Sequence, residues 1–208
     1  MIPDWLQRPV LLLALMASAL LQPSAESKPE LAPGDISLTG QLLIATADNG
    51  DPRFDHAVIL VVRHNREGAL GIIINHPLEE RPLASLLAEM GADATGVSGS
   101  VLLFAGGPVE PEAGFVLHST DYRRAETLDI DGRVAVTSTP QIVSDIAHRK
   151  GPAKKLIAFG YSGWGPGQLE SELALHAWLT APADPKLIFD EDRDKVWDAA
   201  MARRTLPL

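Results

Sequence analysis

The chain has 208 residues, of which 46% are hydrophobic and 22% are charged, and its formal net charge is −9. A chain of this length and composition suits one globular domain with a substantial core. The excess of acidic over basic residues argues against broad nucleic-acid binding, which depends on Lys and Arg contacts to phosphates. There is no cysteine, which excludes disulfides, thiolate nucleophiles and cysteine-ligated metal sites.

Residues 1–25 resemble a secretory signal. The apolar run Val10–Leu21 follows Arg8 and precedes a small-residue cleavage site at Ala25. This run is too short to span a bilayer as a helix, which needs about 20 residues, but its length and flanks suit a signal core. We therefore expect export to the periplasm, with membrane contact only if the segment stays uncleaved. The alternative is a cytoplasmic protein whose start codon was placed too far upstream.

The segment after this signal is a predicted linker, residues 26–36, because it is rich in proline and charge. Residues 37–208 are predicted to form a single domain. Its first strand is Leu38–Thr46. Two further predicted strands, Ala57–Val62 and Leu70–Ile74, are apolar at every position, which indicates that both faces of each are covered. The short turn between them predicts an antiparallel hairpin.

The middle of the chain mixes a helix with short strands. Pro82 opens a predicted helix whose apolar residues recur at i, i+3, i+4 and i+7, and Gly91 ends it. Val101–Ala105 and Phe115–His118 are predicted strands on either side of a Gly-Gly-Pro turn. Asp131-Gly132, between two alternating segments, predicts a hairpin with a two-residue turn.

In the last third, Pro140 begins a second predicted helix. Lys155–Phe159 is a predicted strand that leads into a glycine-rich loop, Gly160–Gln168, whose composition is unlike a helix or strand interior. Gln168–His176 and Asp190–Arg203 are the last predicted helices. Antiparallel hairpins mixed with single helices indicate the class α+β, or mixed α/β.

The glycine-rich loop carries a serine but matches no catalytic motif. A nucleophile elbow requires glycine two residues after the serine, and Trp164 stands two residues after Ser162. The loop also lacks the lysine of a phosphate-binding loop. A structural turn is therefore the favoured interpretation. Ser162 and Gln168 remain as polar members that a ligand could contact.

The six histidines show neither H-x-H nor H-E-x-x-H spacing. His64 and His76 flank one predicted hairpin, so a metal pair at its open end is conceivable, but a convincing site needs three or four ligands. Histidines bonded to main-chain carbonyls are the favoured interpretation. No catalytic residue, metal or cofactor is predicted. The candidate ligand-binding residues are His64, Asn75, His118, Ser162 and Gln168.

Several ordered motifs resemble the AlgH/YqgE family of bacterial proteins. They are Leu38–Ala45, Asp51–Phe54, His64–Leu78, Gly106–Val109, Gly114–His118, the run from Gly160 to Glu170, Trp178, Ala181–Asp184 and Trp197. The resemblance covers about residues 37–202 and implies an α+β fold whose bifurcated, hairpin-rich sheet forms a pseudo-barrel with flanking helices. It also implies a regulator of transcription without an established biochemical activity. The chain departs from the family's pattern at Thr46–Gly50, where a Met-Pro pair is usual, and in its N-terminal extension.

Three functions follow as hypotheses. The first is a non-enzymatic regulatory or partner-binding protein with an unknown protein partner. It is favoured because the glycine-rich loop specifies a backbone shape but carries no recognisable set of catalytic residues. The second is an uncharacterised hydrolase or small-ligand-binding enzyme that uses His64, Asn75, His118 and Ser162 at strand ends, where sheet-based sites form. The third is a transcriptional regulator that binds DNA directly. The net charge disfavours this function, and export of the protein would prevent it.

Overall fold

The computed structural model describes residues 37–189 and 192–205. The predicted signal (1–25) and linker (26–36) therefore lie outside the described residues. Within the described ranges, the structure contains no helix with the length and apolar character that a membrane span requires.

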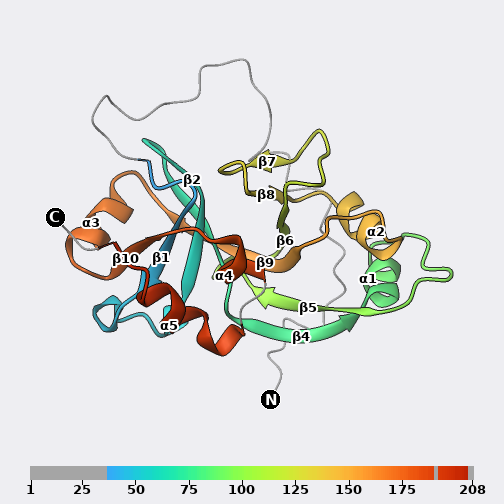
Figure 1. Cartoon of the computed structure of the whole chain (residues 1–208), viewed down its shortest axis with the longest axis horizontal. Helices are drawn as coiled ribbons and strands as arrows, with labels where there is room; N and C mark the ends of the chain where they lie inside the picture. Colours follow the sequence, from blue (N-terminus) through green and yellow to red (C-terminus); the bar gives the residue numbers. More distant parts are fainter. Residues whose placement is uncertain (1–36, 190–191, 206–208) are drawn as a thin grey trace.

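One curled sheet organises the described part of the chain (Figure 1). Its strands are β1 (Gln41–Ala45), β2 (Val58–Asn65), β3 (Gly68–Ile73), β4 (Pro77–Pro82), β5 (Ser100–Ala105), β6 (Val109–Ser119), β7 (Leu128–Asp129), β8 (Val134–Thr137), β9 (Lys155–Trp164) and β10 (Trp178–Pro182). The main path through the sheet is β10-β1-β2-β3-β9-β6-β8-β7, and β5 and β4 branch from β9. Neighbouring strands are antiparallel except β5 and β9, which are parallel.

Short helices flank the sheet. They are α1 (Leu83–Glu89), α2 (Gln141–Ala147), α3 (Gln168–Ala174), α4 (Pro185–Phe189) and α5 (Val196–Met201), with 3₁₀ turns at Ala47–Asn49, Pro52–Phe54 and Arg193–Lys195. Figure 1 shows α1 and α2 together beside one half of the sheet and α3 beside the other half. This mixed α/β half-barrel confirms the predicted fold class, including the bifurcated sheet.

Strand β9 joins the two halves of the sheet. Its first half pairs with β5 and β6, whereas Ser162–Trp164 pair with β3. Gly160 lies at the change of partners with φ +75°, and a Cβ there would stand 2.4 Å from the carbonyl oxygen of Gly107. Only glycine fits so close a crossing of two backbones. The predicted loop is therefore wrong for Gly160–Trp164, because glycine at the crossing bends the strand without ending it.

Three apolar cores hold the sheet and the helices together. The first lies inside the curl, where Leu60 and Leu117 from the two halves of the sheet share a cluster with Ile188 of α4 and Ala200 of α5. The second packs the other face of β1–β3 against α3, and the third packs α1 and α2 on β5, β6 and β9. Strand β2 contributes Leu60 to the first core and its neighbour Ile59 to the second. This explains its uninterrupted apolar sequence.

Two sheet edges were absent from the predicted elements. Strand β4 is polar and starts and ends with proline, and β10 pairs with β1 at the opposite edge. The predicted strands on either side of the Gly-Gly-Pro turn do form, but β9 lies between them, so β5 and β6 are not partners. These pairings connect segments that are distant in sequence, and local patterns do not encode them.

Two predicted boundaries also differ from the structure. The β7–β8 connection spans Ile130–Arg133, because Asp131 Oδ1 accepts the amides of Arg133 and Val134 and closes a longer turn. Of the predicted helix Asp190–Arg203, residues 190–191 lie outside the described residues, and the described part contains α5 preceded by a 3₁₀ turn. Asp192 caps that turn by accepting the amide of Asp194.

Candidate functional site

The predicted site residue His64 fastens the chain at two points. Its Nδ1 accepts the Leu38 amide at 3.0 Å, so the neutral ring carries its proton on Nε2, which donates to Glu170 Oε1 at 2.7 Å. The His64 side chain is 3% exposed. His64 pairs with Ala69 beside the hairpin turn, whereas His76 follows the far end of β3. The conceived metal pair is therefore wrong, because the two histidines lie at opposite ends of the hairpin.

Asn75 and His118 are also bonded within the fold. Asn75 Oδ1 accepts the Val58 amide and its Nδ2 donates to the His56 carbonyl, both at 2.8 Å, which fixes the start of β2. His118 Nδ1 donates to the Ser119 carbonyl at 2.8 Å, and its Nε2 accepts from Thr137 Oγ1 at 2.9 Å. Burial lowers the pKa of His118, which keeps its ring neutral for this arrangement.

Ser162 and Gln168 lie apart from these residues. Ser162 is 1% exposed, and its Oγ has no hydrogen-bond partner among the described residues. Gln168 accepts the Gly165 amide at 3.1 Å and donates to Glu172 Oε1 at 2.8 Å. Glu172, which the sequence reasoning missed, takes the indole N–H groups of Trp164 and Trp178 on its other oxygen. The sequence signal that could have identified Glu172 is its position four residues after Gln168 on one predicted helix, a spacing that brings two side chains together.

A polar pocket of about 310 Å³ lies between the turn before β2, the end of β3 and α5. This volume is at the lower end of the range for small-molecule sites. Of the five predicted residues, Asn75 alone lines it. The described lining residues are His56, Asn75, His76, Arg193, Asp194, Trp197 and Asp198.

One wall of the polar pocket is strained and aromatic. His56 has φ +52°, a conformation that costs a non-glycine residue energy and that recurs at binding sites. Its ring meets Trp197 edge to face at 4.7 Å, and its Nδ1 is 2.8 Å from Asp55 Oδ1. Trp197 Nε1 donates to the Ala45 carbonyl at 2.9 Å. The indole is thus held in place as a fixed wall.

His76 supplies an acceptor to the pocket. Its Nε2 donates to the Asp55 carbonyl at 3.2 Å, and burial is the main cause that lowers the pKa of His76. The ring is therefore neutral at pH 7, with its proton on Nε2. Its Nδ1 keeps a free lone pair that can accept a hydrogen bond.

The unpaired charges of the polar pocket are negative. Arg193 donates to the carbonyls of Ile74, Ile188 and Leu187 at 3.2, 3.0 and 3.4 Å, so its guanidinium ties β3 to α4. Asp194 and Asp198 are exposed, and neither carboxylate forms an ion pair or hydrogen bond with a described residue. Two free carboxylates, a neutral imidazole acceptor and an indole can receive a cationic group. No described group of three or more His, Asp and Glu could hold a metal ion.

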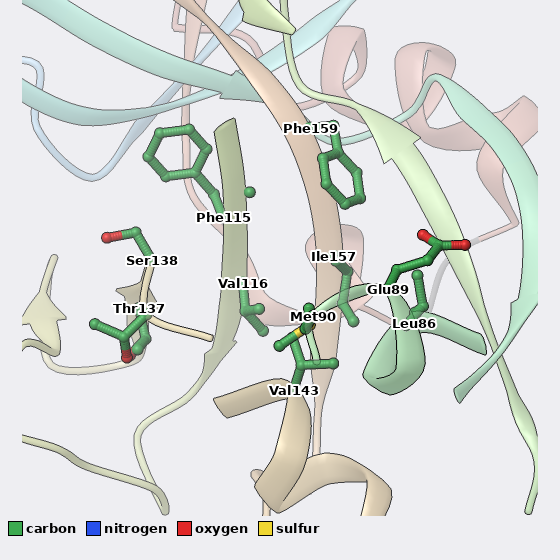
Figure 2. Close-up of a pocket in the computed structure, with 12 residues that line it drawn as sticks. Leu86, Glu89, Met90, Phe115, Val116, Thr137, Ser138, Val143, Ile157 and Phe159 are labelled. Carbon is green, nitrogen blue, oxygen red and sulfur yellow. The ribbon is translucent and has the colours of Figure 1, made fainter. Parts of the chain in front are cut away.

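A second pocket between α1, α2, β6 and β9 is apolar and measures about 20 Å³. That volume holds one or two water-sized groups. Figure 2 shows Leu86, Met90, Val116 and Val143 converging on it. The side chains that line this pocket pack the two helices against the sheet.

The curled, bifurcated sheet and its flanking helices define a mixed α/β half-barrel protein with a polar pocket at one side. A sequence profile described as AlgH-like matches residues 42–208, and the chain belongs to the AlgH-like family. This confirms the resemblance found in the sequence.

Proteins named UPF0301 cover most of the chain. One from Jannaschia sp. (strain CCS1) is 48% identical over 166 residues, which are 79% of this chain and 86% of that protein. Another from Methylococcus capsulatus is 41% identical over 180 residues, or 86% of this chain and 98% of that protein. The names of these relatives give a family and no activity.

Two solved structures share the fold. The solution structure of AlgH from Pseudomonas aeruginosa aligns with a TM-score of 0.68 and 35% identity, over 86% of this chain and 92% of that chain. The crystal structure of a Corynebacterium diphtheriae protein aligns with a TM-score of 0.62 over 90% of this chain and 94% of that chain. Its identity is 17%, so it shows likeness of fold alone.

Proposed function

We propose that this AlgH-like protein is a non-enzymatic binding protein of a regulatory kind, and that its polar pocket receives a small molecule carrying an amine or guanidinium group. The observation that carries this proposal is the presence of two carboxylates, Asp194 and Asp198, on the pocket wall beside Trp197, neither with an ion-pair partner in the described part of the chain. A cation gains charge-assisted hydrogen bonds from the carboxylates and attraction to the indole ring.

The positions of the polar residues favour binding over hydrolysis. A hydrolase of the expected kind needs a nucleophile within reach of a base. Ser162 is buried without a histidine partner, and His118 accepts from Thr137 inside the fold. Among the described residues that line the polar pocket there is no serine, threonine or lysine. Direct DNA binding gains no support from a chain of net charge −9.

The affinity should be modest because both carboxylates are exposed. Exposed ion pairs contribute about 1 kcal/mol or less each, so we expect a small cation to bind no more tightly than a millimolar Kd, which corresponds to about −4 kcal/mol. Agmatine and putrescine are suitable probes, because they present a guanidinium or an amine on a short chain. Their binding would be followed by NMR chemical shifts of the Trp197 indole N–H.

A charge-neutral double variant tests the site. Asp194→Asn with Asp198→Asn keeps side-chain size but removes both charges, and we expect agmatine affinity to fall at least fivefold. Asp48→Asn, in the exposed 3₁₀ turn after β1, is the control of matched charge change and should leave affinity unchanged. Equal losses in both variants, or no shift of the Trp197 signal with any probe, would refute the proposal.

A further inference from the structure

The inside of the curled sheet opens beside the β2–β3 hairpin in a pocket separate from the polar one. Its volume is about 50 Å³, which is room for about four water-sized groups. Most of its wall is apolar, and two residues with polar side chains complete it. The described lining residues are Val62, Arg63, Leu70, Phe115, Leu128, Val136 and Ser138.

Arg63 brings a charge to this apolar opening. It stands opposite Leu70 in the β2–β3 pairing, and Leu70 belongs to the core inside the curl. Residues directly opposite one another in antiparallel strands share a face of the sheet, so Arg63 stands on the inner face. Its Nε is buried without a hydrogen-bond partner, and its guanidinium forms no ion pair with a described residue.

Ser138 supplies a second unsatisfied donor from the other half of the sheet. It directly follows β8, is 7% exposed, and its Oγ has no partner among the described residues. Figure 2 shows its hydroxyl pointing away from the apolar pocket under α1 and α2. Buried polar groups in folded proteins nearly always have a hydrogen-bond partner, so a buried donor without a protein partner is available to an acceptor that enters the site. Two such donors, one of them charged, line the same opening.

We propose that this opening binds the carboxylate of a small monocarboxylic acid whose short apolar body packs on Phe115 and Leu128. The planar guanidinium of Arg63 matches a carboxylate, because Nε and a terminal nitrogen can donate to its two oxygens together. Ser138 Oγ adds a third donor. The volume suits a carboxylate with one or two carbons inside, and the rest of a chain of about four carbons would lie at the mouth.

One cation with apolar walls favours a carboxylate over a phosphate. A phosphate carries more charge and three or more acceptor oxygens, which require a cluster of donors or cations. The described lining offers one guanidinium and one hydroxyl. This inference is independent of the polar pocket, which binds the opposite charge.

Butyrate is the probe, with butyramide, butylamine and inorganic phosphate as comparisons. Titration of the full chain would be followed by NMR at the Arg63 Nε–H signal and by calorimetry. We expect butyrate to move the Arg63 signal, and the comparison molecules to bind at least tenfold more weakly. Arg63→Gln should lower butyrate affinity at least tenfold, and Ser138→Ala about threefold.

Arg66→Gln is the matched control, because it removes the same charge from the exposed turn of the same hairpin. It should keep butyrate affinity within twofold, and Arg63→Lys should recover only part of the loss. The proposal fails if well-folded protein does not bind butyrate, if phosphate binds more tightly, or if Arg66→Gln matches Arg63→Gln. Agmatine binding by the Arg63→Gln variant tests the polar pocket separately.

Discussion

Glu172 of α3 accepts a hydrogen bond of 2.7 Å from the indole of Trp178 in β10. The same oxygen accepts the Trp164 indole from β9 at 2.8 Å, and the two rings meet edge to face at 5.8 Å. One carboxylate thus joins a helix to two strands at opposite ends of one half of the sheet.

Removal of this carboxylate should destabilise the fold. Glu172→Ala leaves two partly buried indole N–H groups without an acceptor, and each unsatisfied group costs about 1–3 kcal/mol. We therefore expect the free energy of unfolding to fall by about 2–4 kcal/mol, measured by urea denaturation with tryptophan fluorescence. Ser171→Ala on the exposed side of α3 is the control and should cost less than about 1 kcal/mol. A similar loss in both variants would contradict the bridging role.

The two partners in the His64–Glu170 bond should contribute unequally. Glu170 is 52% exposed, and an exposed pair is worth about 1 kcal/mol or less. Glu170→Gln should therefore change the free energy of unfolding by less than about 1 kcal/mol. His64→Leu also removes the acceptor of the Leu38 amide, and should cost about 1–3 kcal/mol. Chemical denaturation of both variants measures this order, and a larger cost for Glu170→Gln would disprove it.

Gly160 should tolerate no side chain. Alanine there meets both the strained φ of +75° and the Gly107 carbonyl oxygen at 2.4 Å. Gly132 has nearly the same φ, +76°, with no atom within 4 Å of an added Cβ, so Gly132→Ala isolates the conformational cost. That cost is about 1–2 kcal/mol. We expect Gly160→Ala to lower the free energy of unfolding by clearly more in the same assay, and equal losses would mean that the backbone crossing is unimportant.

Stability should fall on mild acidification. Burial lowers the pKa values of His76 and His118 in the folded protein below the ordinary value of 6.5. Between the lowered pKa of each histidine in the folded protein and its ordinary value in the unfolded chain, the unfolded chain binds more protons. The free energy of unfolding therefore rises with pH across that window. Their contribution is complete above about pH 6.5 and is lost as pH falls toward the folded pKa.

His118→Gln provides the test of that pH dependence. The variant lacks the titrating ring, so the slope of unfolding free energy against pH between 5 and 6.5 should be smaller than in the unchanged chain. Urea denaturation at half-unit pH steps measures both slopes. An unchanged slope would show that His118 protonation is not coupled to unfolding.

The sequence alone determined the class of fold, the family and most of the local elements. The uninterrupted apolar runs of β2 and β3 indicate strands that are covered on both faces. The spacing of Leu83, Leu86 and Leu87 specifies one buried face of α1. Such signals are local, because side-chain periodicity reports directly whether one or two faces of an element are covered. Ordered motifs along most of the chain then identified the family.

Tertiary structure alone decided how β9 serves both halves of the sheet and which polar residues meet. Gly160 is a turn residue by composition, but the approach of Gly107 makes it a crossing point inside a strand. His64, Asn75 and His118 are plausible site residues by type, yet the polar atoms of each are already hydrogen-bonded within the fold. The polar pocket and the Arg63 opening combine segments from distant parts of the chain. Long-range pairing creates them, and no local pattern records it.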